Sequence, residues 1–229
     1  MRNHFILLGI LGFMATACLQ KPNKAGNNPA VSKSHLLNAD YSETFDSYKT
    51  DTLPSGWFSA VTGNNVPGQW KVILDTENKL VGQVSSAGSG YLFNLLVSEK
   101  YELKDLSLSV NLKAVSGKED QGGGLVWRYQ DNDNYYVARA NPLENNFRLY
   151  KVTNGNRKKL ESYSLPVSSG MWHTIEISHV ADSIKCYFDD QLFLSRIDSS
   201  ITKAGKTGLW AKADAVTYFD DFQLKSLEK

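Results

Sequence analysis

The stretch Gly122–Val152, GGGLVWRYQDNDNYYVARANPLENNFRLYKV, decides the fold class of this chain. Its pattern predicts three short strands that are joined by two polar turns, Asp131–Asn134 and Asn141–Asn145. Both turns are rich in Asn, Asp and Pro, which favour tight turns because they bond to nearby backbone groups or fix φ. The stretch is therefore expected to form an antiparallel three-stranded meander.

The expected pairing sorts the side chains of these strands onto two faces, since successive residues of a strand point to opposite sides. The expected pairs are Trp127–Val137 and Arg128–Tyr136 at the first turn, then Val137–Leu149 and Tyr136–Tyr150 at the second. One face is apolar and predicts a core: Leu125, Trp127, Val137, Phe147 and Leu149. The other face combines arginines and tyrosines with small residues: Gly124, Arg128, Tyr136, Ala138, Arg148 and Tyr150. A register slip of one residue would reverse this assignment.

Strand patterns also dominate the rest of the chain, and helical patterns are scarce. Leu103–Leu112 alternates apolar and polar residues, and Trp172–Val180 does so with Ile175 and Ile177 inward. Further strands are expected at 69–74, 80–84, 91–95, 160–164, 183–188, 191–195, 206–210 and 215–224. Many short strands without intervening helices predict an all-β fold, a two-sheet antiparallel β-sandwich.

The N-terminal segment has the features of an export signal. Arg2 precedes an apolar run, Phe5–Met14, that is too short to span a bilayer comfortably. Ala15-Thr16-Ala17-Cys18 follows and resembles the bacterial lipoprotein signal, in which the Cys is lipidated and becomes the mature N-terminus. An ordinary signal peptide cut after Ala17 is the alternative. We expect a signal peptide over 1–17, a lipidated Cys18 with a flexible tether over 18–40, and a sandwich domain over 41–227.

This organisation predicts an exported lipoprotein that is anchored to a membrane, in the periplasm or at the cell surface, with the outer membrane favoured. Removing residues 1–17 takes Arg2 from the 25 basic residues and leaves 24 against 24 acidic residues. A formally neutral chain argues against a nucleic-acid partner that binds through bulk charge. With Cys18 lipidated, Cys186 has no intramolecular partner, and its apolar neighbours predict a buried thiol.

Several segments carry a resemblance to a known family. They are Gly123–Tyr129, Asn134–Tyr136, Arg139–Asn141, Arg148–Lys151, Trp172–Thr174, Gly208–Asp214 and Phe219–Phe222. In this order they resemble the concanavalin A-like, laminin G-like jelly rolls of exported bacterial proteins, over roughly Glu43 to Leu224. More narrowly, they are similar to the 3-keto-disaccharide hydrolase domain family, long called a domain of unknown function. The resemblance implies two stacked antiparallel sheets, one of them concave and in contact with glycan.

The candidate ligand-binding residues are Arg128, Tyr136, Arg148 and Tyr150. Sugars present CH faces that pack on aromatic rings and hydroxyls that bond to planar donors such as guanidinium. In the alternative interpretation, the arginines and tyrosines merely shield an exposed sheet. Trp210, Lys212 and Asp214 belong to another matched segment and are expected at the rim of the same face, unless Trp210 lies in the core.

Evidence for catalysis in the sequence is thin. Glycoside hydrolysis normally needs two carboxyl groups that flank the scissile bond. The Glu-x-Asp-x-x-Glu motif of related hydrolases does not occur, and Glu176, on the polar side of its strand, is the one catalytic acid that we propose to test. His173 and His179 share the parity of Ile175 and Ile177, which predicts positions at the edge of the core rather than metal ligation.

A structural calcium ion is a further expectation that rests on the resemblance. Sandwiches of this superfamily often hold calcium where the first and last strands meet, which here points to Asp46 and Asp221. Two exposed acidic strand ends are the alternative. The leading hypothesis is an exported, lipid-anchored sandwich that binds carbohydrate on its concave sheet. A hydrolase or lyase acting on an oxidised disaccharide and a structural or adhesive module of the envelope are the alternatives.

Overall fold

The computed structural model describes residues 40–63 and 67–228. The predicted signal peptide, Cys18 and nearly all of the predicted tether lie outside these residues. The described part contains fifteen strands: β1 (Tyr41–Glu43), β2 (Trp57–Thr62), β3 (Trp70–Asp75), β4 (Asn78–Gln83), β5 (Phe93–Ser98), β6 (Leu106–Ser116), β7 (Gly123–Asp131), β8 (Asn134–Asn141), β9 (Asn146–Thr153), β10 (Asn156–Ser164), β11 (Trp172–Val180), β12 (Ser183–Phe188), β13 (Gln191–Ile197), β14 (Lys206–Lys212) and β15 (Val216–Ser226). No helix in this part is long and apolar enough to cross a membrane.

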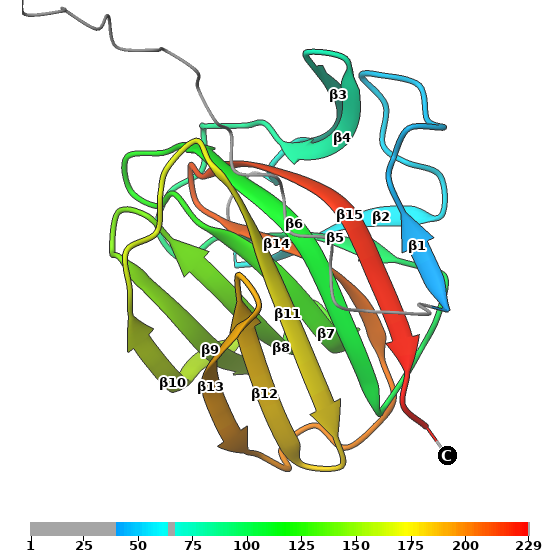
Figure 1. The fold of residues 1–229 in the computed structure, drawn as a ribbon, viewed down its shortest axis with the longest axis vertical. Coiled ribbons are helices and arrows are strands. Elements are labelled where there is room, and N and C mark those ends of the chain that lie inside the picture. Colours follow the sequence, from blue (N-terminus) through cyan, green and yellow to red (C-terminus); the bar gives the residue numbers. More distant parts are fainter. Residues whose placement is uncertain (1–39, 64–66, 229) are drawn as a thin grey trace, which may run out of the picture. The chain divides into compact units, whose positions relative to one another are not determined.

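The strands form two antiparallel sheets that stack face to face (Figure 1). The eight-stranded sheet has the order β13-β12-β11-β6-β15-β4-β3, with β1 paired to β15. The seven-stranded sheet has the order β10-β9-β8-β7-β14-β5-β2. The predicted all-β, two-sheet antiparallel sandwich is therefore confirmed. The short strands β1 and β2 were not expected from the sequence.

The core fills the space between the two sheets. Leu106, Leu108, Val110 and Leu112 of β6 are buried, and so are Ile175 and Ile177 of β11, as their alternation predicts. Cys186 of β12 is a free, fully buried thiol in the same cluster, and burial raises its pKa. This confirms that Cys186 acts as a small apolar side chain.

The other side of the seven-stranded sheet, which we call the outer face, carries a second apolar cluster. Its buried members are Ala60, Phe93, Leu95, Val97, Val126, Tyr129, Tyr135, Val137, Tyr150, Val152 and Trp210. The sheet curls over these side chains and brings strands together that are not neighbours in it. The Thr62 hydroxyl at the end of β2 lies 2.7 Å from the Tyr135 hydroxyl of β8. The Tyr91 hydroxyl, just before β5, likewise donates to the carbonyl of Gly155 in the β9–β10 turn at 2.8 Å. The curvature thus encloses part of the outer face.

The predicted register within Gly122–Val152 is wrong by one residue at each turn. Trp127 pairs with Tyr136, and Val137 pairs with Tyr150. Two successive slips cancel for β9, so β7 and β9 keep their predicted faces and β8 alone is reversed. Tyr136, Ala138 and Ala140 therefore lie in the core between the sheets, and Val137 lies on the outer face.

A β-bulge causes the first slip. The pairing of β7 with β8 shifts between Trp127 and Asp131, and Arg128 adopts a φ of 45°, a left-handed conformation that is uncommon for a residue with a side chain. At the second turn, Asn141 pairs with Asn146, so the turn holds four residues rather than an odd number. Neither detail is visible in the alternation of apolar residues.

Candidate functional site

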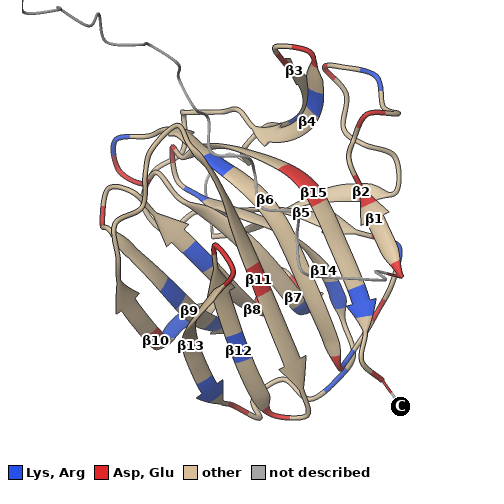
Figure 2. Ribbon diagram, viewed as in Figure 1, with Lys and Arg blue, Asp and Glu red and all other residues tan. Residues whose placement is uncertain are grey.

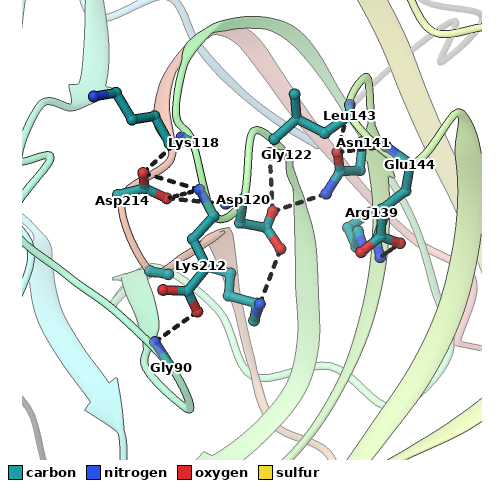
Figure 3. A network of polar contacts seen from close by, with 12 residues as sticks. Gly90, Lys118, Asp120, Gly122, Arg139, Asn141, Leu143, Glu144, Lys212 and Asp214 are labelled. Carbon is teal, nitrogen blue, oxygen red and sulfur yellow. Dashed lines mark hydrogen bonds and ion pairs between the residues drawn. The ribbon is translucent and has the colours of Figure 1, made fainter.

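One end of the outer face carries a set of interacting polar side chains, which we call the charged cluster. Figure 3 shows Asp120, Arg139, Glu144 and Lys212 of this cluster. Its members are Asp120, Arg139, Glu144, Arg148, Tyr150 and Lys212. Arg139 of β8 pairs with Arg148 of β9, so both side chains project from the same side of the sheet. Tyr150 follows two residues after Arg148 and lies on that side as well.

Glu144 joins the two arginines. Its Oε2 accepts from Arg139 Nη2 at 2.8 Å and from Arg148 Nη1 at 2.6 Å. The Tyr150 hydroxyl lies 3.3 Å from a guanidinium nitrogen of each arginine. Partial burial would raise the pKa of Glu144, but the hydrogen bonds from Arg139 and Asn146 and the two positive charges hold it at about 2. Glu144 is therefore an anion at neutral pH.

Asp120 and Lys212 form a third ion pair in the cluster, besides those of Glu144 with the two arginines. Asp120 is almost fully buried, and its Oδ2 accepts from Lys212 Nζ at 3.1 Å. Its Oδ1 accepts from the Gly122 backbone amide at 3.1 Å and from Asn141 Nδ2 at 3.0 Å. These partners hold the Asp120 carboxylate in one orientation, between Lys212 at the end of β14 and Asn141 at the end of β8.

The loop before β7 closes one side of the cluster. Asp214 accepts hydrogen bonds from the successive backbone amides of Lys118, Glu119 and Asp120, at 2.6, 3.1 and 2.9 Å. Burial opposes ionisation of Asp214, but these amides lower its pKa overall. Glu119 accepts from the Gly90 amide at 2.7 Å and ties this loop to the segment before β5. An open pocket of about 510 Å³ adjoins the loop at Lys118 and Asp214.

Among the described residues, three buried side-chain N–H groups on the outer face lack an acceptor, and two of them belong to almost fully buried side chains. These two are Arg139 Nε and Trp210 Nε1, from side chains that are 2% and 0% exposed. Trp210 Nε1 is directed at the Tyr135 hydroxyl and, as a donor, acts to lower the pKa of Tyr135, but the contact is too long or too bent for a well-formed hydrogen bond, and no other described residue supplies an acceptor. Gly124 of β7 pairs with both residues, so no side chain separates them. Because unsatisfied buried donors are costly, they mark a place where a ligand oxygen would be favoured.

The structure corrects the prediction for Arg128. Its side chain is fully buried at the bulge, away from the charged cluster. The guanidinium donates to the backbone carbonyls of Lys104, Ile201 and Ala181, each at 2.8 Å, and lies 3.4 Å from Asp105. Arg128 thus fastens three loops at one end of the sandwich.

Tyr136 is corrected too, because the reversal of β8 turns its ring into the core. The ring stacks on Trp127 at 5.7 Å between centroids, and the hydroxyl donates to Asp198 at 2.6 Å. His179 is also fully buried there, and its Nδ1 accepts from Trp127 Nε1 at 2.9 Å. His173 instead pairs with Asp189 at 2.7 Å. Neither histidine belongs to a group of three potential metal ligands among the described residues.

The remaining predicted ligand-binding residues lie on or beside the outer face. Arg148 and Tyr150 belong to the charged cluster, as does Lys212. Trp210 is buried on the outer face, where its ring packs on Phe93 at 5.4 Å between centroids, and so it does not lie in the core between the sheets. Asp214 sits beside the cluster and orders its loop. Whether these residues bind a ligand remains a prediction.

Glu176 lies on the opposite sheet from the charged cluster. It belongs to β11, in the eight-stranded sheet, and its carboxylate accepts from the Ser107 hydroxyl at 3.4 Å. It cannot act together with Arg148 and Tyr150, which project from the far side of the other sheet. Any catalytic role of Glu176 would need a separate site.

The acidic residues that the calcium expectation named have separate partners. Asp46 accepts from the Thr44 hydroxyl at 2.9 Å, and Asp221 accepts from Asn111 Nδ2 at 2.9 Å. Across residues 40–63 and 67–228, no three acidic, His or Cys side chains converge in a way that could hold a metal ion. Calcium binding therefore stays a prediction without support from this geometry.

Sequence reasoning missed Arg139, Glu144 and Asp120. The predicted register gave Arg139 the same parity as Val137, which would place an arginine in the core. A buried, unpaired arginine is costly, so this conflict was a sign in the sequence that the predicted register of β8 was wrong. Shifting β8 by one residue removes it and places Arg139 opposite Arg148.

Comparisons with known proteins define the class of this fold. The chain is similar to the carbohydrate-binding module CBM66 from Bacillus subtilis, with 22% identity, a TM-score of 0.61 and coverage of 75% of this chain and 96% of the module. It is also similar to the β-glucanase of Bacillus licheniformis, with 14% identity, a TM-score of 0.59 and coverage of 82% and 99%. A protein of unknown function with a galectin-like fold from B. subtilis has 8% identity, a TM-score of 0.56 and coverage of 82% and 96%.

These similarities show a concanavalin A-like, galectin-like β-sandwich. At such low identity they show the fold alone, because one fold hosts many functions. No protein-family model matches the chain, and no curated protein matches it. The narrower resemblance to the 3-keto-disaccharide hydrolase domain family therefore stays a prediction.

Proposed function

We propose that this protein binds carbohydrate on the outer face of its seven-stranded sheet, at the charged cluster. The observation that carries the proposal is the buried Arg139 Nε, an N–H donor on a 2% exposed side chain that meets no acceptor among the described residues. A sugar hydroxyl or ring oxygen is an acceptor of the right kind. The fold is one that a carbohydrate-binding module and a β-glucanase share, which supports this ligand class.

The cluster offers the complementary groups that a sugar needs. Arg148 and Glu144 keep side chains that are 27% and 39% exposed, so a ligand can reach a donor and an acceptor side by side. Fixed partners hold Asp120, Lys212 and Arg139 in place before binding. Such preorganisation limits the entropy lost on association.

Binding is proposed rather than hydrolysis. Glycoside hydrolases need one carboxyl group that is protonated near neutral pH. Glu144 and Asp214 have lowered pKa values, which favours the charged form and opposes such a role. A hydrolase that acts on an oxidised disaccharide has no specific observation in its favour at this site.

A glycan microarray followed by calorimetry tests the proposal. Arg148→Ala should weaken binding of any glycan that the protein retains by about tenfold or more, since hydrogen bonds to charged groups contribute about 1.5–3 kcal/mol. Arg196→Ala is the matched control, because Arg196 is exposed on β13 in the other sheet. Failure to bind any glycan, or equal affinity of both variants, would contradict the proposal.

We also propose that the protein is exported and anchored through a lipid on Cys18. The support is the sequence pattern of the first 18 residues, Arg2 and an apolar run followed by small residues and a cysteine. Metabolic labelling with a fatty-acid analogue in a bacterial host should label the native chain, and Cys18→Ser should remain unlabelled and leave the membrane fraction. Equal labelling of both chains would refute the anchor.

A further inference from the structure

We propose that the sugar recognised at the charged cluster carries an anionic group, either the carboxylate of a uronic acid or a sulfate ester. This inference rests on the proposed carbohydrate function and names the class of ligand for the same face. Three observations support it: the balance of charge on the face, the chemical type of the unpartnered groups, and the setting of Arg157.

Positive charge is in excess around the cluster. Arg157 and Lys159 of β10 pair with Val152 and Tyr150, so they share the outer face. Figure 2 shows Lys and Arg segments along β9 and its neighbours. Including the adjoining loop, the cationic side chains are Lys118, Arg139, Arg148, Arg157, Lys159 and Lys212, and the acidic ones are Glu119, Asp120, Glu144 and Asp214. The formal excess is two positive charges, although the whole chain is close to neutral.

The other acidic residues of this sheet do not belong to the charged cluster. Glu161 of β10 pairs with Leu149, a residue of the core between the sheets, and is therefore not counted on the outer face. Asp131 and Asp133 lie in the exposed β7–β8 turn. Asp131 is occupied within the turn, where its Oδ1 accepts from the Asp133 amide and from Asn134 Nδ2, both at 2.8 Å. Both residues lie at the end of β7 and β8 that is opposite the charged cluster, where their charges act on Tyr129.

Every unpartnered buried polar atom that the structure describes on the outer face is a donor. Besides Arg139 Nε and Trp210 Nε1, Arg157 Nη1 meets no acceptor. Two of these three atoms belong to guanidinium groups, which remain charged at any physiological pH. A neutral sugar could occupy the donors with hydroxyl oxygens, but it would leave the excess charge desolvated. An anionic group supplies acceptors and charge together, and such hydrogen bonds are about twice as strong as neutral ones.

Two aromatic rings position the Arg157 guanidinium on the outer face, where it could bind an anionic group. The guanidinium carbon lies 4.7 Å from the centroid of Phe93 and 4.5 Å from that of Tyr150. The rings fix the plane of the guanidinium through cation–π contacts and leave its edge for hydrogen bonds. The Tyr91 hydroxyl accepts from the Arg157 backbone amide at 2.6 Å, which holds this part of β10 over the face. In contrast to Arg139 and Arg148, Arg157 makes no ion pair with any described carboxylate.

The test uses a microarray that holds uronate-containing, sulfated and neutral glycans, with the native chain as the probe. Binding enriched among the acidic glycans is the expected result, and the uronate and sulfate groups of the array distinguish the two sources of charge. Calorimetry then compares the tightest acidic glycan with its carboxyl-reduced or desulfated form. We expect the neutral form to bind at least tenfold more weakly, and binding of the acidic form to weaken as salt rises.

Variants assign the effect to the face. Arg157→Gln should weaken the acidic glycan at least tenfold and the neutral form by much less, whereas Arg196→Gln should change neither. Circular dichroism and thermal unfolding establish that each variant is folded, and Arg148→Gln serves as a second variant on the more exposed side of the cluster. Binding restricted to neutral glycans would overturn this inference but leave the proposed carbohydrate function intact. Absence of binding to every glycan would overturn both.

Discussion

His179 should make the folded protein lose stability as the pH falls from 7 to 5. Its imidazole is fully buried and packs edge-on against Trp127 and Tyr136, and Nδ1 accepts from Trp127 Nε1 at 2.9 Å. Burial, together with the nearby Arg128 charge, lowers its pKa from 6.5 to about 3. At pH 5, therefore, His179 binds a proton in the unfolded chain but not in the folded chain.

The sign and size of the effect follow from this difference in proton binding. Because the pKa of His179 is lower in the folded chain, the free energy of unfolding is unaffected by this residue above the unfolded pKa of 6.5. It falls progressively as the pH decreases from 6.5 towards 3. At pH 5 the gap is about 1.5 pH units, which corresponds to about 2 kcal/mol at 1.36 kcal/mol per unit. The lowered pKa values of Glu144 and Asp198 act only below about pH 4.5, outside this range.

Asp220 works in the opposite direction and must be separated from His179. Burial and the neighbouring Asp221 charge raise its pKa from 3.8 to about 6. A raised carboxyl pKa adds stability as the pH falls from 6, which amounts to about 1 kcal/mol at pH 5. The native chain should therefore lose only about 1 kcal/mol between pH 7 and 5.

Urea unfolding at several pH values between 7.5 and 5 distinguishes the two residues. His179→Asn keeps an acceptor for Trp127 Nε1 and removes the titration, so its free energy of unfolding should rise slightly, rather than fall, on acidification. Asp220→Asn should instead steepen the loss to about 2 kcal/mol. Parallel pH profiles for the native chain and His179→Asn would refute the assignment of the titration to His179.

Three further expectations concern the scaffold. Arg128→Met should lower the free energy of unfolding by about 3 kcal/mol or more in urea, because three carbonyls lose their donor; a loss below 1 kcal/mol would contradict its role in fastening the loops. Gly124→Ala should abolish folding or lower the melting temperature sharply, since a Cβ there would lie 1.9 Å from the Ala138 carbonyl oxygen; a native-like melting curve would show that the strands can separate. Cys186 should resist a thiol reagent in a folded Cys18→Ser variant and react once urea unfolds the chain, because it is fully buried; rapid reaction without urea would argue against its place in the core.

Most of the fold could be predicted because alternation survives in each strand separately. β11 and β12 occupy the residues that the sequence indicated, and the inward residues of β6 are those expected. The missed strands β1 and β2 are short or irregular in pattern, with three and six residues. The alternation within single strands was therefore enough to predict the fold class, since each sheet needs one consistently apolar face.

The candidate site was predictable only in part. Alternation along β9 and β14 correctly indicated which side of the sheet carries Arg148, Tyr150 and Lys212. Tyr136 was lost and Arg139 was missed because the one-residue slip reverses β8, whereas Arg128 of β7 was lost because it sits at the bulge and its side chain is buried there. A bulge adds residues to one strand without disturbing the alternation of its partner, so the sequence holds no direct record of it.

The sequence alone determined that this chain forms an antiparallel sandwich, which faces β7 and β9 bury, and that Cys186 is internal. These properties depend on periodicity within single strands and on the apolar character of neighbours. Only the tertiary structure decided which arginines meet on the outer face, that Glu144 and Asp120 join them, and that Arg139 and Arg157 keep buried donors without an acceptor among the described residues. Those outcomes depend on register and on sheet curvature, which are set by contacts between residues far apart in the chain.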